Sequence, residues 1–114
     1  MSSKSLFTKV PYFKIDEERE PRAVRLVLSG ELDLASVPEL RGRLDQLRAE
    51  RRNVRLDLSK LEFMDSTGVH LLISRLQDSR ADGWRLDVDP DVAPGVMRLL
   101  RLVRLDRFVL GDDS

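Results

Sequence analysis

The chain contains no cysteine, and this absence already excludes several classes of protein. Without thiols there is no disulfide framework, no thiolate metal site and no cysteine nucleophile. The 114 residues also include only one histidine and no Gly-rich phosphate-binding loop. Because catalysis needs a nucleophile with a base, a metal site or a phosphate cradle, we predict a protein that is not an enzyme and that uses no cofactor and no metal.

Net charge and long apolar runs are missing as well. The 20 basic residues balance the 20 acidic residues, so the chain lacks the positive field that is typical of proteins that bind nucleic acid directly. No run approaches the roughly 18 apolar residues that span a membrane, and the first nine residues lack the apolar core of a secretory signal. We therefore predict a cytoplasmic protein whose partners are proteins, not nucleic acid or membrane.

What the sequence does contain fits one α/β domain. Apolar residues at 41% and charged residues at 35% of 114 residues suffice for a single core. Apolar alternation predicts strands around residues 12–17, 23–28, 54–59, 84–88 and 108–110. Apolar residues at three- and four-residue steps predict helices over about residues 36–50, 65–82 and 91–103. The fold class is therefore α/β, with a mixed sheet of four to five strands and helices mainly on one face.

Local signals predict where several of these elements begin and end. Ser29-Gly30 has turn chemistry and is expected to end the first long strand. Ser36 stands three residues before Glu39, the spacing of a capping box that opens a helix. Asp65 is predicted to cap the second helix, and Asp82-Gly83 to stop it.

The junction at Ser66 is the most informative place in the chain. The run from Leu58 to Gly68 connects an alternating strand to an amphipathic helix. The Ser66 hydroxyl lies where the strand and the helix meet. The first N–H groups of a helix have no partner within the helix, and the helix dipole is positive there. A phosphate on Ser66 is therefore expected to be compatible with the fold, as a switch requires.

Three runs of residues together resemble the STAS domain of bacterial anti-sigma-factor antagonists. They are Gly30-Glu31-Leu32-Asp33, Phe63-Met64-Asp65-Ser66-Thr67-Gly68 and the Asp82-Gly83 turn. The similarity extends from about Phe13 to Leu110. From the extent of this resemblance we predict a flexible N-terminus over residues 1–9, a STAS domain over residues 10–110 and a C-terminal tail over residues 111–114.

The resemblance also implies a function and a set of partners. In this family the serine at the position of Ser66 is phosphorylated by a partner that is both an anti-sigma factor and a serine kinase, and a serine phosphatase reverses the modification. The unphosphorylated form binds the kinase and frees the sigma factor. The residues expected to contact the partner are Asp33, Asp65, Ser66, Thr67, Gly68 and His70.

The roles expected of these residues differ. Thr67 points about 100° away from Ser66 around the helix, so we interpret it as a contact or local hydrogen-bonding residue. Gly68 in a first helical turn indicates close approach by another backbone or by a partner. Asp33 is placed by the resemblance beside Ser66, where its carboxylate can bind a partner or orient the hydroxyl; the alternative is a solvated loop charge.

His70 departs from the family pattern, which commonly has glycine or another small residue there. It lies four residues after Ser66 and so shares its helical face. A charged imidazole can reach a phosphate from this position, and the alternative is an exposed or partner-facing histidine with no special role.

One other interpretation of the function stays open. STAS domains also serve as scaffold subunits of stress-signalling or lipid-transport complexes without a phosphorylation switch.

Near the end of the chain, four arginines recur at three-residue spacing: Arg98, Arg101, Arg104 and Arg107. We interpret this basic row as a solvated face.

Overall fold

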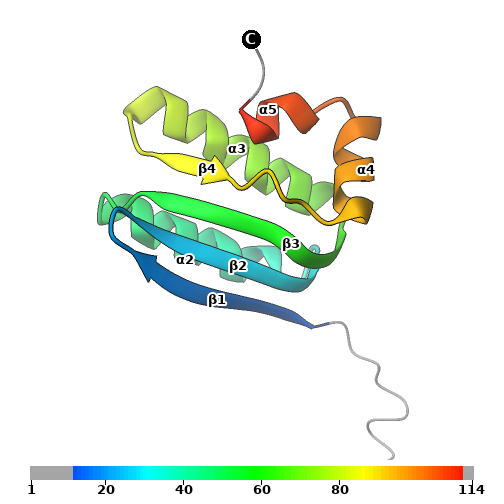
Figure 1. The fold of residues 1–114 in the computed structure, drawn as a ribbon, viewed down its shortest axis with the longest axis horizontal. Coiled ribbons are helices and arrows are strands. Elements are labelled where there is room, and N and C mark those ends of the chain that lie inside the picture. The colour runs from blue at the N-terminus through cyan, green and yellow to red at the C-terminus, as the bar shows by residue number, and fades with distance from the viewer. Residues whose placement is uncertain (1–11, 112–114) are drawn as a thin grey trace, which may run out of the picture.

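A computed structural model describes residues 12–111, which form one sheet and four helices (Figure 1). In chain order the elements are β1 (Phe13–Glu20), β2 (Ala23–Leu32), α2 (Val37–Ala49), β3 (Val54–Met64), α3 (Ser66–Asp82), β4 (Leu86–Val88), α4 (Pro94–Leu102) and α5 (Asp106–Leu110). None of the helices in this range is long and apolar enough to cross a membrane. The predicted N-terminal segment 1–9, and all of the predicted tail except Gly111, lie outside the described residues.

The four strands lie in the order β1-β2-β3-β4. β1 runs antiparallel to β2, whereas β2, β3 and β4 are parallel to one another. The two parallel connections pass through α2 and α3, and the right-handed crossover rule places both helices on the same face of the sheet. Figure 1 shows them together behind the strands, and their ion pairs Arg75–Asp45 and Arg48–Asp78 join the two helices. The predicted α/β class and mixed sheet are confirmed.

The core lies between the sheet and this helical layer. Alternate residues of β2 and β3 point into it, and the apolar stripes of α2 and α3 close it. Its fully buried members include Val24, Leu26, Leu28, Val54, Leu56, Leu58, Leu40, Leu44 and Leu72.

The opposite face of the sheet is polar and is held together by ion pairs. Arg25 donates to Asp57 at 2.6 Å and contacts Asp89 at 2.8 Å, while Arg55 contacts Asp89 at 3.3 Å. Burial raises the pKa of the Asp57 carboxyl, but hydrogen bonds from Ser59 and Arg25 outweigh burial, and the pKa is lowered overall. Asp57 is thus an ionised group that joins neighbouring strands.

The prediction that Ser29-Gly30 ends a strand is wrong. β2 continues to Leu32, and the ladder to β3 is irregular on both sides of Gly30. Gly30 has a φ of +89°, and a Cβ built on it would lie 2.1 Å from the Tyr12 carbonyl oxygen. That oxygen accepts a hydrogen bond from the Glu31 amide at 2.8 Å. The glycine is therefore required by a kink inside the strand and not by a turn at its end.

The predicted capping box at the start of α2 does not form. The Ser36 hydroxyl donates to the Glu31 carbonyl at 2.7 Å and accepts from the Asp33 amide at 2.9 Å, and it makes no cap hydrogen bond to the helix. A tertiary contact with the end of β2 has replaced the local one. The helix still begins where it was expected, directly after Ser36.

The closing strand predicted over residues 108–110 is also wrong, because these residues belong to α5. Three apolar residues in a row fit a strand and a buried helical turn equally well. In the structure Val109 is buried, and the Arg80 guanidinium lies 4.3 Å from the centre of the Phe108 ring. The third helix likewise begins at Pro94 and not near Asp91, because the Ala93 amide still donates to Leu58 of β3 at 3.2 Å.

Replacing Gly30 with alanine should destabilise the fold by roughly 2–5 kcal/mol, because the new methyl group meets the Tyr12 carbonyl at a positive φ. Gly42 lies within α2, and nothing is within 4 Å of the point where a Cβ would lie. Gly42→Ala should therefore stabilise the protein by about 0.5–1 kcal/mol. Urea unfolding followed by circular dichroism measures both, and equal effects of the two variants would contradict this account of Gly30.

Candidate functional site

Parallel pairing brings the two sequence motifs together at one edge of the sheet. Leu32, the last residue of β2, is paired with Met64, the last residue of β3, so both strands end at the same level. The Asp65 amide then donates to the Leu32 carbonyl at 3.2 Å. The pairing of Leu32 with Met64 therefore makes the two motifs neighbours in the fold, although they are some 30 residues apart in the sequence.

Asp65 caps α3 as predicted. Its backbone is extended, with φ −103° and ψ −173°, and its carboxylate accepts from the amides of Thr67 at 2.9 Å and Gly68 at 3.2 Å. Burial raises the pKa of the Asp65 carboxyl, but the hydrogen bonds from the Thr67 hydroxyl and from these amides lower it further than burial raises it. Asp65 is therefore ionised at neutral pH and fixes the start of the helix.

The two adjacent hydroxyls have different environments. Thr67 is partly buried, and its hydroxyl donates to the same Asp65 carboxylate. Ser66 is exposed at the first position of α3, and within residues 12–111 its hydroxyl forms no hydrogen bond. Only the Ser66 hydroxyl is thus both accessible and unengaged, whereas the Thr67 hydroxyl belongs to the cap.

Gly68 is buried and allows α3 to approach the sheet closely. A Cβ at this position would lie 2.7 Å from Met64 Cγ and 3.0 Å from the Leu32 carbonyl oxygen. The close approach that a glycine in this turn indicates is therefore to the chain's own backbone. A side chain here would push the first turn of α3 away from Leu32 and Met64 at the ends of β2 and β3.

Asp33 shapes the loop between β2 and α2, and within residues 12–111 it forms no hydrogen bond with Ser66. One of its carboxylate oxygens accepts from the amides of Ala35 at 3.1 Å and Ser36 at 3.2 Å. The other oxygen has no hydrogen-bond partner among the described residues. The loop that Asp33 holds presents the Leu34 side chain, which is 74% exposed.

Ser66 lies in the rim of a shallow depression between α2 and α3. The depression has a volume of about 650 Å³. Its wall is apolar where Leu34, Val37, Pro38 and Leu71 lie, and it is basic at Arg41, His70 and Arg75. Arg75 is already bonded to Asp45 at 2.8 and 3.2 Å, whereas Arg41 has no ion pair within residues 12–111.

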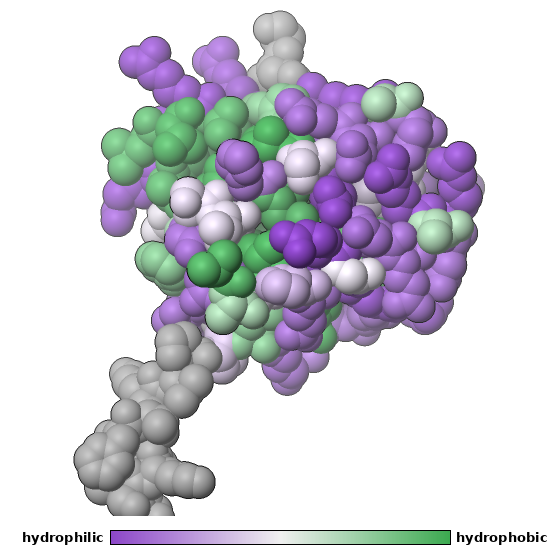
Figure 2. Space-filling view, turned by 180° about the vertical axis from the view of Figure 1, so that it is seen from behind, coloured by the Kyte–Doolittle hydropathy of each residue, from purple (hydrophilic) through white to green (hydrophobic). Residues whose placement is uncertain are grey.

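Figure 2 shows the surface pattern around these helices. Apolar side chains gather toward the left of that view, the end of the molecule where α3 and α4 begin in Figure 1, and hydrophilic side chains cover the right. Leu34 and Arg41 were not among the predicted site residues. The signal that could have identified Leu34 is an apolar residue within the otherwise polar loop after β2, whereas nothing local distinguishes Arg41 from its neighbouring arginines.

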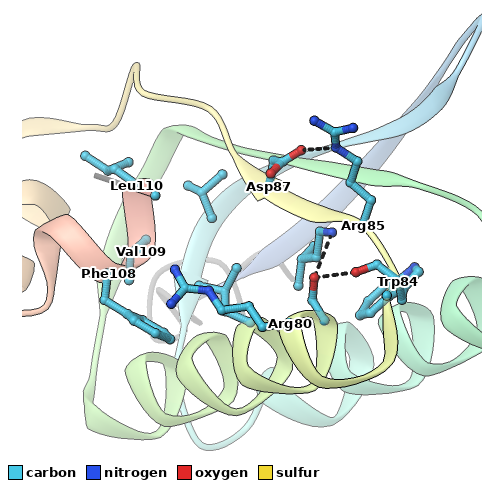
Figure 3. A pocket seen from close by; sticks show the side chains of 13 residues that line it. Arg80, Trp84, Arg85, Asp87, Phe108, Val109 and Leu110 are labelled. Atoms are coloured by element: carbon cyan, nitrogen blue, oxygen red, sulfur yellow. Dashed lines mark hydrogen bonds and ion pairs between the residues drawn. The ribbon is translucent and has the colours of Figure 1, made fainter. Parts of the chain in front are cut away.

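A second concavity, of about 330 Å³, lies between α3, β4 and α5 (Figure 3). Its polar groups bond to one another: the Ser79 hydroxyl contacts the Trp84 carbonyl and accepts from the Leu86 amide at 3.2 Å, and Arg85 pairs with Asp87 at 3.3 Å. It is far from Ser66 along α3. We interpret it as a consequence of how α5 packs beside the edge strand.

Comparison with known proteins gives a consistent result. The profile of a protein family described as "Mlab, STAS domain" matches residues 15–111. The anti-sigma-B factor antagonist of Bacillus subtilis (strain 168) is 24% identical over 95 residues, which cover 83% of this chain and 86% of that protein.

Solved structures share the fold. A crystal structure of an anti-sigma factor antagonist from Mycobacterium paratuberculosis has a TM-score of 0.72 at 24% identity, covering 85% of this chain and 82% of that one. Bacillus SpoIIAA in its unphosphorylated form has a TM-score of 0.69 at 24% identity, covering 89% of each chain. Its phosphorylated form has a TM-score of 0.65 at 21% identity, covering 90% and 92%.

Asp65→Ala should lower the free energy of unfolding by about 0.5–2 kcal/mol at pH 7, because the amides of Thr67 and Gly68 lose their cap. The folded-state pKa of Asp65 is lowered, so its stabilising effect is present above the unfolded-state pKa and is lost as the pH falls through the folded-state pKa. The difference between the two proteins should therefore shrink in acid. Urea unfolding between pH 7 and pH 2 measures it.

Ser66→Ala is the matched control, because the Ser66 hydroxyl is exposed and unbonded within residues 12–111. It should change stability by less than about 0.5 kcal/mol at any pH. A pH-independent effect of Asp65→Ala would contradict the role of its carboxylate.

Proposed function

Because the chain belongs to the STAS domain family, we propose that it is an anti-sigma factor antagonist that acts as a phosphorylation-switched binding module. In its unphosphorylated form it binds an anti-sigma factor with serine kinase activity, and a sigma factor is released. Phosphorylation at Ser66 by that kinase ends the binding, and a serine phosphatase restores it. The protein is the target of this chemistry and performs none of its own.

The observation that carries the proposal is the environment of Ser66. Its hydroxyl is exposed, is unbonded within the described residues and lies in the rim of an apolar depression that presents Leu34. An exposed apolar surface beside a modifiable hydroxyl supports a protein interface. A kinase can reach the hydroxyl without any part of α3 unfolding.

Electrostatics explains how a phosphate on Ser66 would end binding. Phosphorylation adds a charge of about −1.5 to −2, and enclosing an unpaired charge in an interface costs several kcal/mol. A cost of about 1.4 kcal/mol already weakens binding tenfold. Since Asp65 lies next to Ser66 and is ionised, the added charge would also meet an existing negative charge.

The same phosphate need not disturb the fold. The amides of Thr67 and Gly68 are occupied by Asp65, so the helix offers its dipole and not these two amides. Arg41 and His70 line the depression in which Ser66 lies, and both can receive an anionic group there. This expectation is supported by SpoIIAA, a protein of the same fold that has been solved in its unphosphorylated and its phosphorylated form.

We propose that the six predicted residues contribute to the interface in different ways. Ser66 and His70 are exposed and would touch the partner directly. The carboxylate oxygen of Asp33 that lacks a partner within residues 12–111 would accept a hydrogen bond from it. Asp65, Thr67 and Gly68 would mainly hold the presenting turn in place, because their polar groups and contacts are already used within the fold.

A scaffold without a switch is the second candidate. It is favoured by the occupied amides at the start of α3, because a phosphate on Ser66 would find the Thr67 and Gly68 amides already bonded to Asp65. In that case the protein would bind its partner through the depression between α2 and α3 regardless of Ser66. The two candidates differ in whether Ser66 is modified.

Incubation with ATP, magnesium and a candidate anti-sigma factor kinase should add one phosphate at Ser66, as measured by mass spectrometry of peptides. Ser66→Ala should abolish the modification, whereas the matched variant Thr67→Val should retain it because the Thr67 hydroxyl is bonded to Asp65. Kinase binding by isothermal titration should weaken by about a hundredfold or more on phosphorylation, which corresponds to a loss of about 2.7 kcal/mol or more.

Tight binding by both the phosphorylated and unmodified proteins would support the scaffold instead. Phosphate on Thr67 alone would contradict the assignment of Ser66. His70→Gly with unchanged phosphorylation, dephosphorylation and binding would show that His70 has no special part in the switch.

A further inference from the structure

The arginine row of the sequence forms a basic surface on α4 and the residues that follow it. Arg98 and Arg101 are exposed on α4, Arg104 follows the helix with a φ of 60°, and Arg107 lies on α5. None of the four forms an ion pair within residues 12–111. By contrast, most arginines of the sheet and of α2 and α3 form ion pairs, among them Arg25 and Arg75.

The charge of this segment stands out from the rest of the chain. Residues 94–107 contain these four arginines and one acidic residue, Asp106, which gives the segment a net charge of +3. The whole chain has a net charge of zero. In this segment four arginines follow one another at three-residue spacing, with a single acidic residue among them.

Apolar side chains lie among the arginines. Leu102 is 74% exposed and Val103 is 46% exposed, while Val96 and Leu100 on the other face of α4 are buried. A depression of about 580 Å³ runs along the outer side of the helix, lined by Val92, Pro94, Met97, Arg98, Arg101 and Leu102. Figure 2 shows apolar atoms bordered by polar ones on the side where α4 lies in Figure 1.

We propose that this surface of α4 docks an acidic, amphipathic segment of a partner protein. An aliphatic side chain of that segment enters the depression beside Met97 and Leu102, and its carboxylates pair with Arg98 and Arg101. Because Arg98 and Arg101 are three residues apart, and Leu102 follows Arg98 by four, the three side chains share one helical face. Amphipathic helices commonly lay their apolar face into such a groove, so the partner segment is taken to be helical.

The residue types favour a protein over a membrane as the occupant. All basic residues of the surface are arginines, which pair with carboxylates in a bidentate manner and are enriched at protein interfaces. The surface is concave where the apolar residues lie. Helices that bind a membrane surface instead present a protruding apolar face, often with Trp or Phe, and α4 has no aromatic residue.

This surface is distinct from the one around Ser66. The two depressions have no lining residue in common. The segment seated in the depression on α4 therefore contacts a different set of residues from a partner seated in the depression around Ser66. The inference does not depend on whether Ser66 is modified.

The test uses the full chain labelled with ¹⁵N and a synthetic amphipathic peptide of glutamate, alanine and leucine, with leucines at three- and four-residue spacing. Binding of the peptide should shift the amide resonances of residues 94–103. In the double variant Arg98→Glu/Arg101→Glu, the affinity for the peptide should be lower by about tenfold or more. Leu102→Ser should also weaken binding while leaving the fold intact, because the side chain is 74% exposed. A peptide of the same composition with scattered leucines should bind less tightly.

Arg19→Glu/Arg22→Glu, on exposed residues of the β1–β2 hairpin, is the matched control, since it makes the same change of net charge. It should leave peptide binding unchanged. Equal loss in this control, equal binding of the scattered peptide, or no shift in residues 94–103 would each overturn the proposal. So would binding to vesicles of phosphatidylglycerol that depends on Arg98 and Arg101 when the peptide does not bind.

Discussion

The carbonyl oxygen of Leu32 accepts the Asp65 amide at 3.2 Å and lies 3.0 Å from where a side chain on residue 68 would begin. This hydrogen bond, and the close approach that the glycine allows, fix the start of α3 against the end of β2. They need the parallel register of Leu32 with Met64, and they need glycine at position 68. The exposed hydroxyl of Ser66 and the loop that presents Leu34 are held in one place because both are attached to this junction.

A rigid base for that junction comes from the two faces of the sheet. On one face the leucines and valines of β2 and β3 are fully buried beneath α2 and α3. On the other, Arg25 joins Asp57 at 2.6 Å and Asp89 at 2.8 Å, so charged groups bridge β2, β3 and the segment after β4. Isolated surface ion pairs contribute little, but a network with a buried carboxylate loses more when one partner is removed. Arginines of α2 and α3 form ion pairs of their own, such as Arg48 with Asp78 and Arg75 with Asp45. The arginines of α4 differ from them, because they have no ion pair within residues 12–111.

The sequence predicted elements whose signals are local and missed those that tertiary contacts decide. Asp65 caps α3, and Gly83 follows it with a φ of 77°, as the residue types indicated. Ser36 and Glu39 had the spacing of a capping box, yet the Ser36 hydroxyl bonds to Glu31 because the end of β2 is within reach. Apolar residues 108–110 suited a strand or a helical turn, and packing against α3 and β4 selected the turn. Within the site, the predicted residues lie around one junction or in the loop beside it, but no pattern in the chain showed that Leu34 and Arg41 would join them across two helices.

The division of roles between the two hydroxyls at the start of α3 follows from one carboxylate. The Asp65 carboxylate accepts hydrogen bonds from the amide and the hydroxyl of Thr67, so this hydroxyl is already engaged within the fold. The same carboxylate accepts a hydrogen bond from the Gly68 amide. The positive end of the helix is thus already matched by a negative charge before any modification occurs. A phosphate added at Ser66 would be surplus charge at the surface, balanced only by the dipole and by side chains such as Arg41 and His70. Such a group alters what the surface can bind far more than it alters the fold beneath it, because the contacts that define the fold at this point do not involve the Ser66 side chain.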